Sequence, residues 1–272
     1  MTADAPGFMD QGLLSPVTAG QDAATSDTEI FAALLRAEVA LVRAWEAVSD
    51  APAGVAEAVE AAASQLDPQL TAVTVASTAG GNPVIPLVRL LREAVPERMS
   101  AWVHRGATSQ DILDSALMLV AASTASATSA RLRGLETSLT AIARRERDTS
   151  AAARSLTQHA VPTTVGLRVA TWLSGVRRSR HRLDTARAAL PAQLGGAAGT
   201  LASFVELSDA PTARRLVAAY ADILGLTTPR SPWHTTRWPV TELGDALMQT
   251  IDAVGAMAAD VATLSRTEIG EV

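Results

Sequence analysis

An apolar repeat that follows Pro239 constrains the fold more than any other feature of this chain. Its members are separated by three and four residues in strict alternation. That spacing gives a helix one apolar side along its whole length, as in the seam of a long-helix bundle. The sequence therefore predicts a long helix that packs lengthwise against partners. The repeat consists of Val240, Leu243, Leu247, Thr250, Val254, Met257, Val261 and Leu264.

Two further segments, residues 109–148 and 164–190, show related apolar spacings. Residues 121–130 are almost all alanine, serine and threonine, which suits close packing against a neighbouring helix. Three helices of ~30 residues would each be about 45 Å long, much longer than the usual ~11–12 residues. The positions expected to face the bundle are Leu132, Leu135, Leu139 and Ile142 in the first segment and Leu167, Val176, Leu183 and Leu190 in the second.

Upstream of residue 104 the helical patterns are shorter, at residues 29–48, 53–63 and 85–95. No strand-like alternation of convincing length occurs, so the predicted fold class is all-α. We expect a small helical N-terminal domain over residues 1–105 and a long-helix bundle over residues 106–272. The unusual polar residues fall in the expected connecting loops, at 104–111, 154–164, 193–200 and 228–238.

The composition argues against several classes of function. The net charge is −5 and no block of five like charges occurs, which argues against nucleic acid as a partner, because phosphate binding needs clustered basic residues. All 23 basic residues are arginine. Because this sequence contains no lysine, it has neither a Walker A loop nor a Schiff-base lysine.

The sequence also predicts a cytoplasmic protein that does not enter a membrane. No run of about 18 uninterrupted apolar residues occurs. Residues 1–12 lack the basic region and apolar core of a secretory signal. Cysteine is absent, which excludes disulfides and thiolate chemistry and fits a cytoplasmic location.

The segment from His104 to Asp111 holds a dense cluster of polar side chains directly before an apolar run. That position is the start of a helix, where free N–H groups and the helix dipole favour a bound anion. Two interpretations stay open. The segment either binds a carboxylate-bearing small molecule, or it only starts a helix through a capping box formed by Thr108 and Asp111.

Three other polar groups, at residues 154–164, 193–200 and 232–237, lie in predicted loops. Glycines in the second permit close backbone approach to a ligand, and Arg237 in the third could bind a carboxylate bidentately. Metal binding is not expected, since paired ligands at suitable spacing are missing. Three of the four histidines lie in the polar loops, which favours a functional site, and these are His104, His159 and His234.

Five blocks, taken in order, resemble the fumarase/aspartase superfamily, whose members share a long-helix bundle. The resemblance covers residues 29–272 and is greatest to the bacterial 3-carboxy-cis,cis-muconate cycloisomerases. It implies a homotetramer with each active site assembled from three subunits, and no cofactor. The blocks are Gly-Asn-Pro-Val-Ile-Pro-Leu at 81–87, the polar segment and its continuation at 104–117, Gln-His-Ala-x-Pro at 158–162, Gly-Gly-Ala-Ala-Gly-Thr-Leu at 195–201, and Leu-Ser-Arg-Thr-Glu-Ile-Gly-Glu-Val at 264–272.

One pair of residues separates the subfamilies. Adenylosuccinate and argininosuccinate lyases carry Thr-His in the block where this chain has Ser155 and Leu156, and that histidine is their general acid. Here a histidine, His159, directly follows Gln158 instead, as in the cycloisomerases. An amine leaving group needs a proton, whereas a carboxylate departs as a stable anion. The resemblance therefore implies intramolecular addition of a carboxylate across a C=C bond, giving a carboxymuconolactone in the protocatechuate branch of aromatic degradation.

The resemblance also implies roles for the predicted site residues around a small tricarboxylate substrate. Thr108 and Ser109 would stabilise the negative charge that builds up on a neighbouring carboxylate. His159 would be catalytic, either transferring a proton or polarising the substrate. The other substrate-binding residues are expected to be Asn82, His104, Arg105, Ser155, Gln158, His234 and Arg237.

The superfamily's signature loop, Gly-Ser-Ser-x-x-Pro-x-Lys-x-Asn, would lie beyond Val272. By resemblance, that loop carries the serine that acts as general base. We therefore expect a truncated chain that lacks the final bundle helices and shows little or no turnover in a steady-state assay. Turnover near that of ordinary family members would contradict this expectation.

Two alternative functions stay open at this stage. The chain could be a superfamily lyase of the adenylosuccinate or argininosuccinate type, although Leu156 counts against it. It could also be a non-catalytic helical scaffold, which would bind no muconate tricarboxylate under any condition.

Overall fold

The computed structural model describes residues 13–14, 20, 23–66 and 69–272. Residues 1–12, in which the sequence shows no secretory signal, lie outside the described residues. Helices dominate the described part of the chain, as the sequence predicts. The elements are the 3-10 helix Ala23–Thr25, α1 Asp27–Val48, α2 Val55–Ser64, α3 Leu70–Gly80, α4 Val84–Ala94, α5 Glu97–Ser100, α6 Ser109–Arg145, β1 Ser150–Ser155, β2 Gln158–Thr164, α7 Val165–Ala188, α8 Ala202–Leu207, α9 Ala210–Leu224 and α10 Trp238–Leu264.

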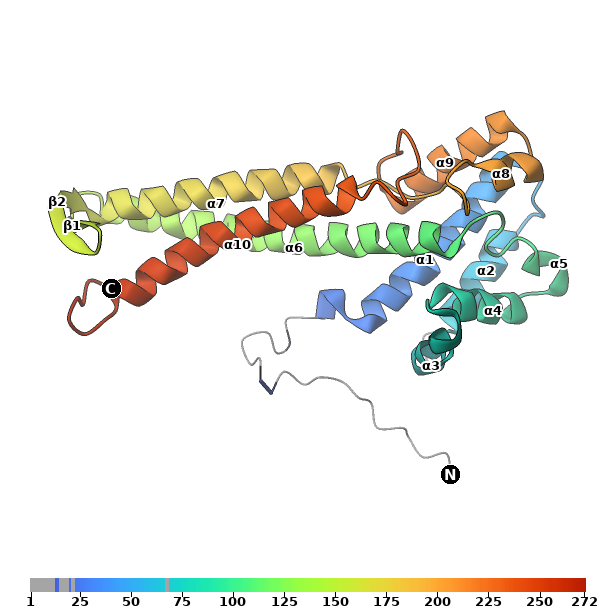
Figure 1. Cartoon of the computed structure of the whole chain (residues 1–272), viewed down its shortest axis with the longest axis horizontal. Coiled ribbons are helices and arrows are strands. Elements are labelled where there is room, and N and C mark those ends of the chain that lie inside the picture. Colours follow the sequence, from blue (N-terminus) through green and yellow to red (C-terminus); the bar gives the residue numbers. More distant parts are fainter. Residues whose placement is uncertain (1–12, 15–19, 21–22, 67–68) are drawn as a thin grey trace, which may run out of the picture.

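Three long helices, α6, α7 and α10, run lengthwise beside one another, and the shorter helices gather at one end of them (Figure 1). Their bounds agree within a few residues with the predicted segments. The starts follow from capping. Thr108 and Asp111 form the expected capping box of α6, and the Thr164 hydroxyl accepts a hydrogen bond from the Leu167 N–H (3.1 Å) at the start of α7.

The bundle buries or half-buries all of the predicted positions except two. Leu167 is 63% exposed, because the buried row of α7 begins at Val169 and continues seven residues apart through Val176 and Leu183. Leu167 lies two residues before that row, which is about 200° around the helix. Val261 of α10 is also exposed, near the end where α10 diverges from α6 and α7 (Figure 1).

A second, larger core joins α1, α2 and α4 to the first turns of α6 and to α9. The sequence did not predict α3, α5, α8 or α9. Of these, α9 contributes Leu216 and the fully buried Tyr220 to the core beside α1. This core therefore contains residues from both sides of position 105, and the domain boundary placed there stays a prediction.

The expectation of a loop at 154–164, and of no strands, is wrong. Strands β1 and β2 pair antiparallel, from Ser150 opposite Thr164 to Ser155 opposite Gln158, with an irregularity near Ala152. Strand β1 is mostly half-buried and β2 is mostly exposed, and neither shows the apolar alternation that marks a strand with one buried face. The hairpin projects from the end of the bundle farthest from the short helices (Figure 1).

Helix α6 is long and apolar enough to cross a membrane by length and composition alone. In this structure 56% of its most apolar window is buried within the protein. It packs against α7 along its length and against α1 near its start. Such burial is typical of the central helix of a bundle.

Replacing Leu183 by alanine is expected to lower the free energy of unfolding by about 2–5 kcal/mol, because this side chain is fully buried in the seam. Urea denaturation followed by circular dichroism measures the change. Leu167→Ala on the same helix is the matched control. Because Leu167 is exposed, this change should lower the free energy of unfolding by less than about 0.5 kcal/mol, apart from the difference in helix propensity between leucine and alanine. Equal losses in the two variants would contradict this packing.

Candidate functional site

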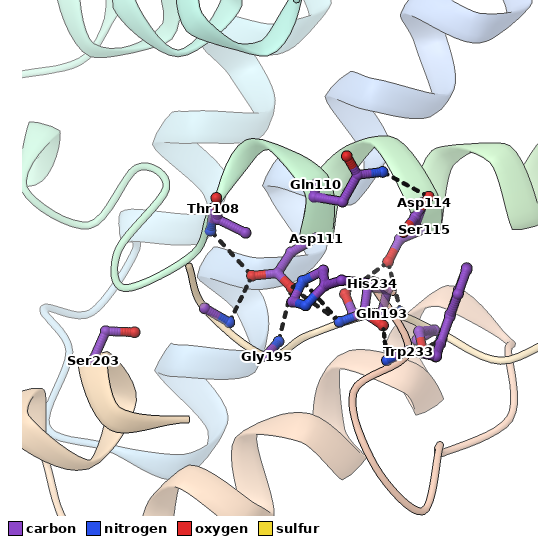
Figure 2. Close-up of polar contacts among 12 residues, drawn as sticks. Thr108, Gln110, Asp111, Asp114, Ser115, Gln193, Gly195, Ser203, Trp233 and His234 are labelled. Carbon is purple, nitrogen blue, oxygen red and sulfur yellow. Dashed lines mark hydrogen bonds and ion pairs between the residues drawn. The ribbon is translucent and has the colours of Figure 1, made fainter. Parts of the chain in front are cut away.

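A fully buried carboxylate, that of Asp111, joins the start of α6 to two distant segments (Figure 2). Burying a charge is costly unless hydrogen bonds compensate for the lost water. The donors come from both sides of the carboxylate and include two glycine N–H groups. Oδ1 accepts from Gln193 Nε2 (3.2 Å), Gly195 N (2.7 Å) and His234 Nε2 (2.8 Å), and Oδ2 accepts from Thr108 N (3.0 Å) and Gly196 N (2.9 Å).

The segment that donates to Asp111 requires glycine at two adjacent positions. A Cβ on Gly195 would lie 2.7 Å from the Pro232 Cβ and 2.9 Å from the His234 Cε1. Gly196 has a φ of +72°, which side-chain-bearing residues rarely adopt. The sequence predicted close approach to a ligand here, whereas the structure shows close approach to the protein's own Pro232 and His234.

Gln193, also fully buried, fixes the same segment to α6 through main-chain contacts. Its N–H donates to the Ser115 hydroxyl (2.9 Å), and that hydroxyl donates to the Gln193 carbonyl (3.0 Å). Its side-chain Oε1 accepts from the Trp233 N–H (2.7 Å). These contacts therefore hold three segments that are far apart in the sequence in fixed positions around Asp111.

The contacts of His234 determine which ring nitrogen carries a proton. Its Nε2 lies 2.8 Å from Asp111 Oδ1 and 3.0 Å from Gln193 Nε2. The Gln193 amide oxygen already accepts from Trp233, so the Gln193 amide nitrogen donates, and its hydrogen bond goes to Asp111 Oδ1 (3.2 Å) and not to His234. Because a carboxylate only accepts, we assign the imidazole proton to Nε2, which leaves Nδ1 on the side of Gly199.

Arg237, predicted to hold a substrate carboxylate, already binds one from the protein. Its two terminal nitrogens donate to Asp114 at 2.7 and 2.9 Å, a bidentate pair. These hydrogen bonds to Asp114 raise the pKa of the Arg237 guanidinium. The group also lies 5.1 Å from the centre of the Trp233 ring. Arg237 thus orders the segment that carries His234, and it retains partial exposure.

A cavity of about 410 Å³ opens beside the first turn of α6, between that turn and α4. His104 and Ser109, two of the predicted site residues, line it. Asn82 lies at the start of α4, where its Oδ1 accepts from the Val84 and Ile85 N–H groups (3.0 and 3.3 Å). Its side-chain oxygen is therefore engaged in capping.

Arg105 makes internal contacts rather than facing that cavity. Its guanidinium stacks 4.5 Å from the centre of the Trp102 ring and 5.9 Å from that of Trp45. Its carbonyl accepts from the Trp45 indole N–H (3.0 Å). Stacking on two aromatic rings stabilises the guanidinium charge in this position, so no bound anion is needed to balance it.

The remaining predicted site residues, Ser155, Gln158 and His159, lie on the hairpin and are exposed. The hairpin follows the end of α6, whereas the Asp111 cluster surrounds its start (Figure 1). A helix of 37 residues is about 55 Å long. One chain therefore brings together the predicted residues at the start of α6 but not those on the hairpin.

A second carboxylate cluster fixes the hairpin to the segment after α10. Glu271 binds Arg154 of β1 through both of its oxygens and also accepts from Arg168 of α7 (2.9 Å). Arg168 in turn donates to the Ala152 carbonyl (3.0 Å). The hydrogen bonds from Arg154, then those from Arg168, lower the pKa of Glu271 to about 2.

The fold and these clusters can be compared with known proteins. Residues 19–272 match the family model described as Lyase. The chain belongs to the lyase family of the fumarase/aspartase superfamily. The superfamily and the helical fold class predicted from the sequence are thereby confirmed.

Among its relatives, this lyase-family chain is 44% identical to nitrosuccinate lyase of Streptomyces davaonensis, over 97% of this chain and 57% of that protein. It is 36% identical to the 3-carboxy-cis,cis-muconate cycloisomerase of Bradyrhizobium diazoefficiens, over 95% and 58% of the two chains. The crystal structure of the 3-carboxy-cis,cis-muconate lactonizing enzyme from Pseudomonas putida matches with a TM-score of 0.84 and 33% identity, over 90% of this chain and 56% of that one. The chain spans somewhat more than half the length of these relatives.

The sequence did not reveal the organising residues of the lyase-family site. Asp111 was expected only to cap a helix, and Asp114, Gln193 and Glu271 were not singled out. A signal was present for all four, since Asp111, Asp114 and Glu271 lie inside blocks that carry the family resemblance and Gln193 lies two residues before one. Among the residues that the structure describes, no group of three or more histidine, aspartate or glutamate side chains is placed to hold a metal ion.

Replacing Asp111 by asparagine is expected to destabilise the protein by about 3–5 kcal/mol, because it removes the charge from a buried hydrogen-bonded cluster and turns one oxygen into a donor. Hydrogen exchange at the Gly195 and Gly196 amides should accelerate together. Asp148→Asn, at a solvent-exposed carboxylate, is the matched control and should leave both amides protected. Unchanged exchange in Asp111→Asn would refute the role of this carboxylate.

The Glu271 cluster should loosen at acid pH. The folded-state pKa of Glu271 is about 2, below the ordinary value of 4.5, so its contribution to stability is complete above pH 4.5 and disappears as the pH falls toward 2. Hydrogen exchange of the segment after α10 is expected to rise over that pH range. In Glu271→Gln the exchange should already be fast at neutral pH. An identical pH profile for the variant and the unmodified chain would contradict this assignment.

Proposed function

We propose that this chain provides part of the active site of a lyase that acts on nitrosuccinate, breaking a carbon–heteroatom bond next to a carboxylate and releasing a stable anion. The observation that carries the proposal is Leu156. It lies at the tip of the hairpin, 93% exposed, where amine-releasing superfamily members are expected to carry their acid histidine. An apolar side chain cannot donate a proton, so the chemistry favoured is one whose leaving group needs none.

Nitrite and a carboxylate are both leaving groups that need no proton. Similarity to known proteins favours nitrite. Loss of a proton from C3 of nitrosuccinate and of the nitro group from C2 leaves a C=C bond and releases nitrite, whereas lactone opening by the same kind of elimination releases a carboxylate. The higher identity, 44% against 36%, is to nitrosuccinate lyase. The 3-carboxy-cis,cis-muconate cycloisomerase activity expected from the sequence is the second candidate, supported by the structural match to the lactonizing enzyme.

The proposed substrate site lies at the start of α6. Ser109 lines the cavity, and the first N–H groups of the helix carry partial positive charge. Negative charge that develops on the substrate carboxylate during bond cleavage would be stabilised there. Thr108 directly precedes Ser109 and Asn82 lies just before α4, while His234 and Arg237 act through their hydrogen bonds to Asp111 and Asp114.

The hairpin residues would reach this site from another copy of the chain. Gln158 and His159 are about 55 Å from the start of α6 in their own chain, by the length of that helix. Large apolar side chains on α10 are exposed, including Met248 (65%) and Ile251 (71%), and association would cover them. A homotetramer in the cytoplasm, the arrangement expected from the resemblance, is the assembly proposed here.

Isothermal titration with nitrosuccinate, 3-carboxy-cis,cis-muconate and adenylosuccinate tests the proposal, together with colorimetric detection of nitrite. Nitrosuccinate is expected to bind most tightly. Ser109→Ala should weaken that binding by about 10-fold or more, because a hydrogen bond to a charged group contributes roughly 1.5–3 kcal/mol. Ser138→Ala, at an exposed position near the C-terminal end of α6, is the matched control and should bind normally.

Each other result favours a different function. Tightest binding of carboxymuconate would favour the cycloisomerase, and tightest binding of adenylosuccinate would favour an amine-releasing lyase. Failure of all three ligands to bind would favour the non-catalytic scaffold.

A further inference from the structure

A second buried carboxylate pairs with a histidine at the other side of the polar segment. Glu38 lies in α1 with its side chain fully buried, and its Oε1 is 2.7 Å from the Nδ1 of His104. His104 has a φ of +58°, in the left-handed region that non-glycine residues rarely adopt. A strained backbone at a buried hydrogen bond indicates that the surrounding structure holds this ring in one orientation.

The pairing with Glu38 determines what His104 offers to a ligand. The ring lines the 410 Å³ cavity beside α6. Its Nδ1 is occupied by Glu38, so the nitrogen left for a ligand is Nε2, which has no hydrogen bond to any residue that the structure describes. A carboxylate accepts hydrogen bonds and does not donate them, so the proton lies on Nδ1 and Nε2 presents a lone pair.

The charges around His104 differ in sign, and the nearest is the negative charge of Glu38, whose Oε1 lies 2.7 Å from Nδ1. Arg89 and Arg92 line the same cavity, and a second positive charge close to them is unfavourable. Glu93 also lines the cavity. Its Oε1 lies 3.9 Å from the Nε of Arg89, so these two opposite charges partly offset each other. Arg92 donates to the Val103 carbonyl (3.0 Å), next to His104 in the chain.

We propose that Glu38 is a positioning residue that holds His104 as the Nδ1–H tautomer, so that Nε2 is a hydrogen-bond acceptor toward the cavity. The ligand atom that meets Nε2 must then carry a hydrogen. This excludes the direct contact between His104 and a substrate carboxylate that the sequence predicted, and assigns the carboxylate to the helix N–H groups instead. The identity of the ligand rests on the proposed function, whereas the tautomer does not.

Nitrogen-15 NMR of the imidazole rings tests the proposal, because protonated and unprotonated ring nitrogens resonate at clearly different positions. The chain has only four histidines, and His104→Asn assigns the signal. At about pH 8 the His104 ring is expected to carry its proton on Nδ1 alone. A proton on Nε2 alone, or on both nitrogens, overturns the proposal.

Two variants separate positioning from simple burial. In Glu38→Leu the ring is expected to change to the Nε2–H tautomer, and in Glu38→Gln the Nδ1–H form should fall in population, since an amide can donate as well as accept. Glu46→Gln is the matched control, because Glu46 lies two turns later in α1 and its Oε1 accepts from the Gly54 N–H instead. Retention of the Nδ1–H form in both Glu38 variants overturns the proposal. Should Glu38→Leu fail to fold, Glu38→Gln and the unmodified chain still decide.

The measurement requires no turnover. Absence of lyase activity would therefore leave the tautomer result standing, and an unexpected tautomer would leave the proposed reaction open.

Discussion

The burial of the Asp111 carboxylate is the constraint on which the polar end of this bundle depends. A charge without access to water is tolerated only when enough donors surround it, and these donors come from residues 108, 193–196 and 234. The same group that starts α6 therefore also sets the position of His234, which lies 123 residues away. Glu271 performs the equivalent task at the other end, where it joins β1, α7 and the segment after α10. Each end of the long helices is fixed by one carboxylate with several donors.

The long helices were predictable because their information is local and periodic. The regular repeat of α10 led to a helix whose start differs by a residue or two from the observed Trp238. Helix α9 has a similar spacing at Ala213, Leu216, Tyr220 and Leu224, but its repeat extends over only 15 residues and the helix was not predicted. The hairpin was missed for a different reason. Neither of its strands contains a fully buried residue, and its two-residue turn uses Leu156 and Thr157 at positive φ rather than the usual glycine or asparagine.

The candidate site was predictable as a set of segments but not as a geometry. Polar loops and histidines at helix ends pointed to the residues around the start of α6, and the cavity there contains His104 and Ser109. The partners of those residues could not be read from the sequence, because they depend on contacts across 66 to 123 positions. Arg237 shows the consequence. An arginine beside a histidine favours carboxylate binding, and only the structure shows that the carboxylate is that of Asp114.

Because the two polar ends are far apart, the bundle acts as a spacer between them, and its length matters more than the residues on its surface. Each residue inserted into α6 would advance the hairpin by about 1.5 Å and rotate it by about 100°. Helix α7 runs back alongside α6. The hairpin therefore keeps its orientation only when both helices change in length together, in steps of about seven residues, or two turns. Within residues 121–130, Ala125 and Ser129 are buried and must stay small, whereas the exposed positions can exchange one small residue for another. The number of residues in this stretch is constrained as strictly as its buried positions.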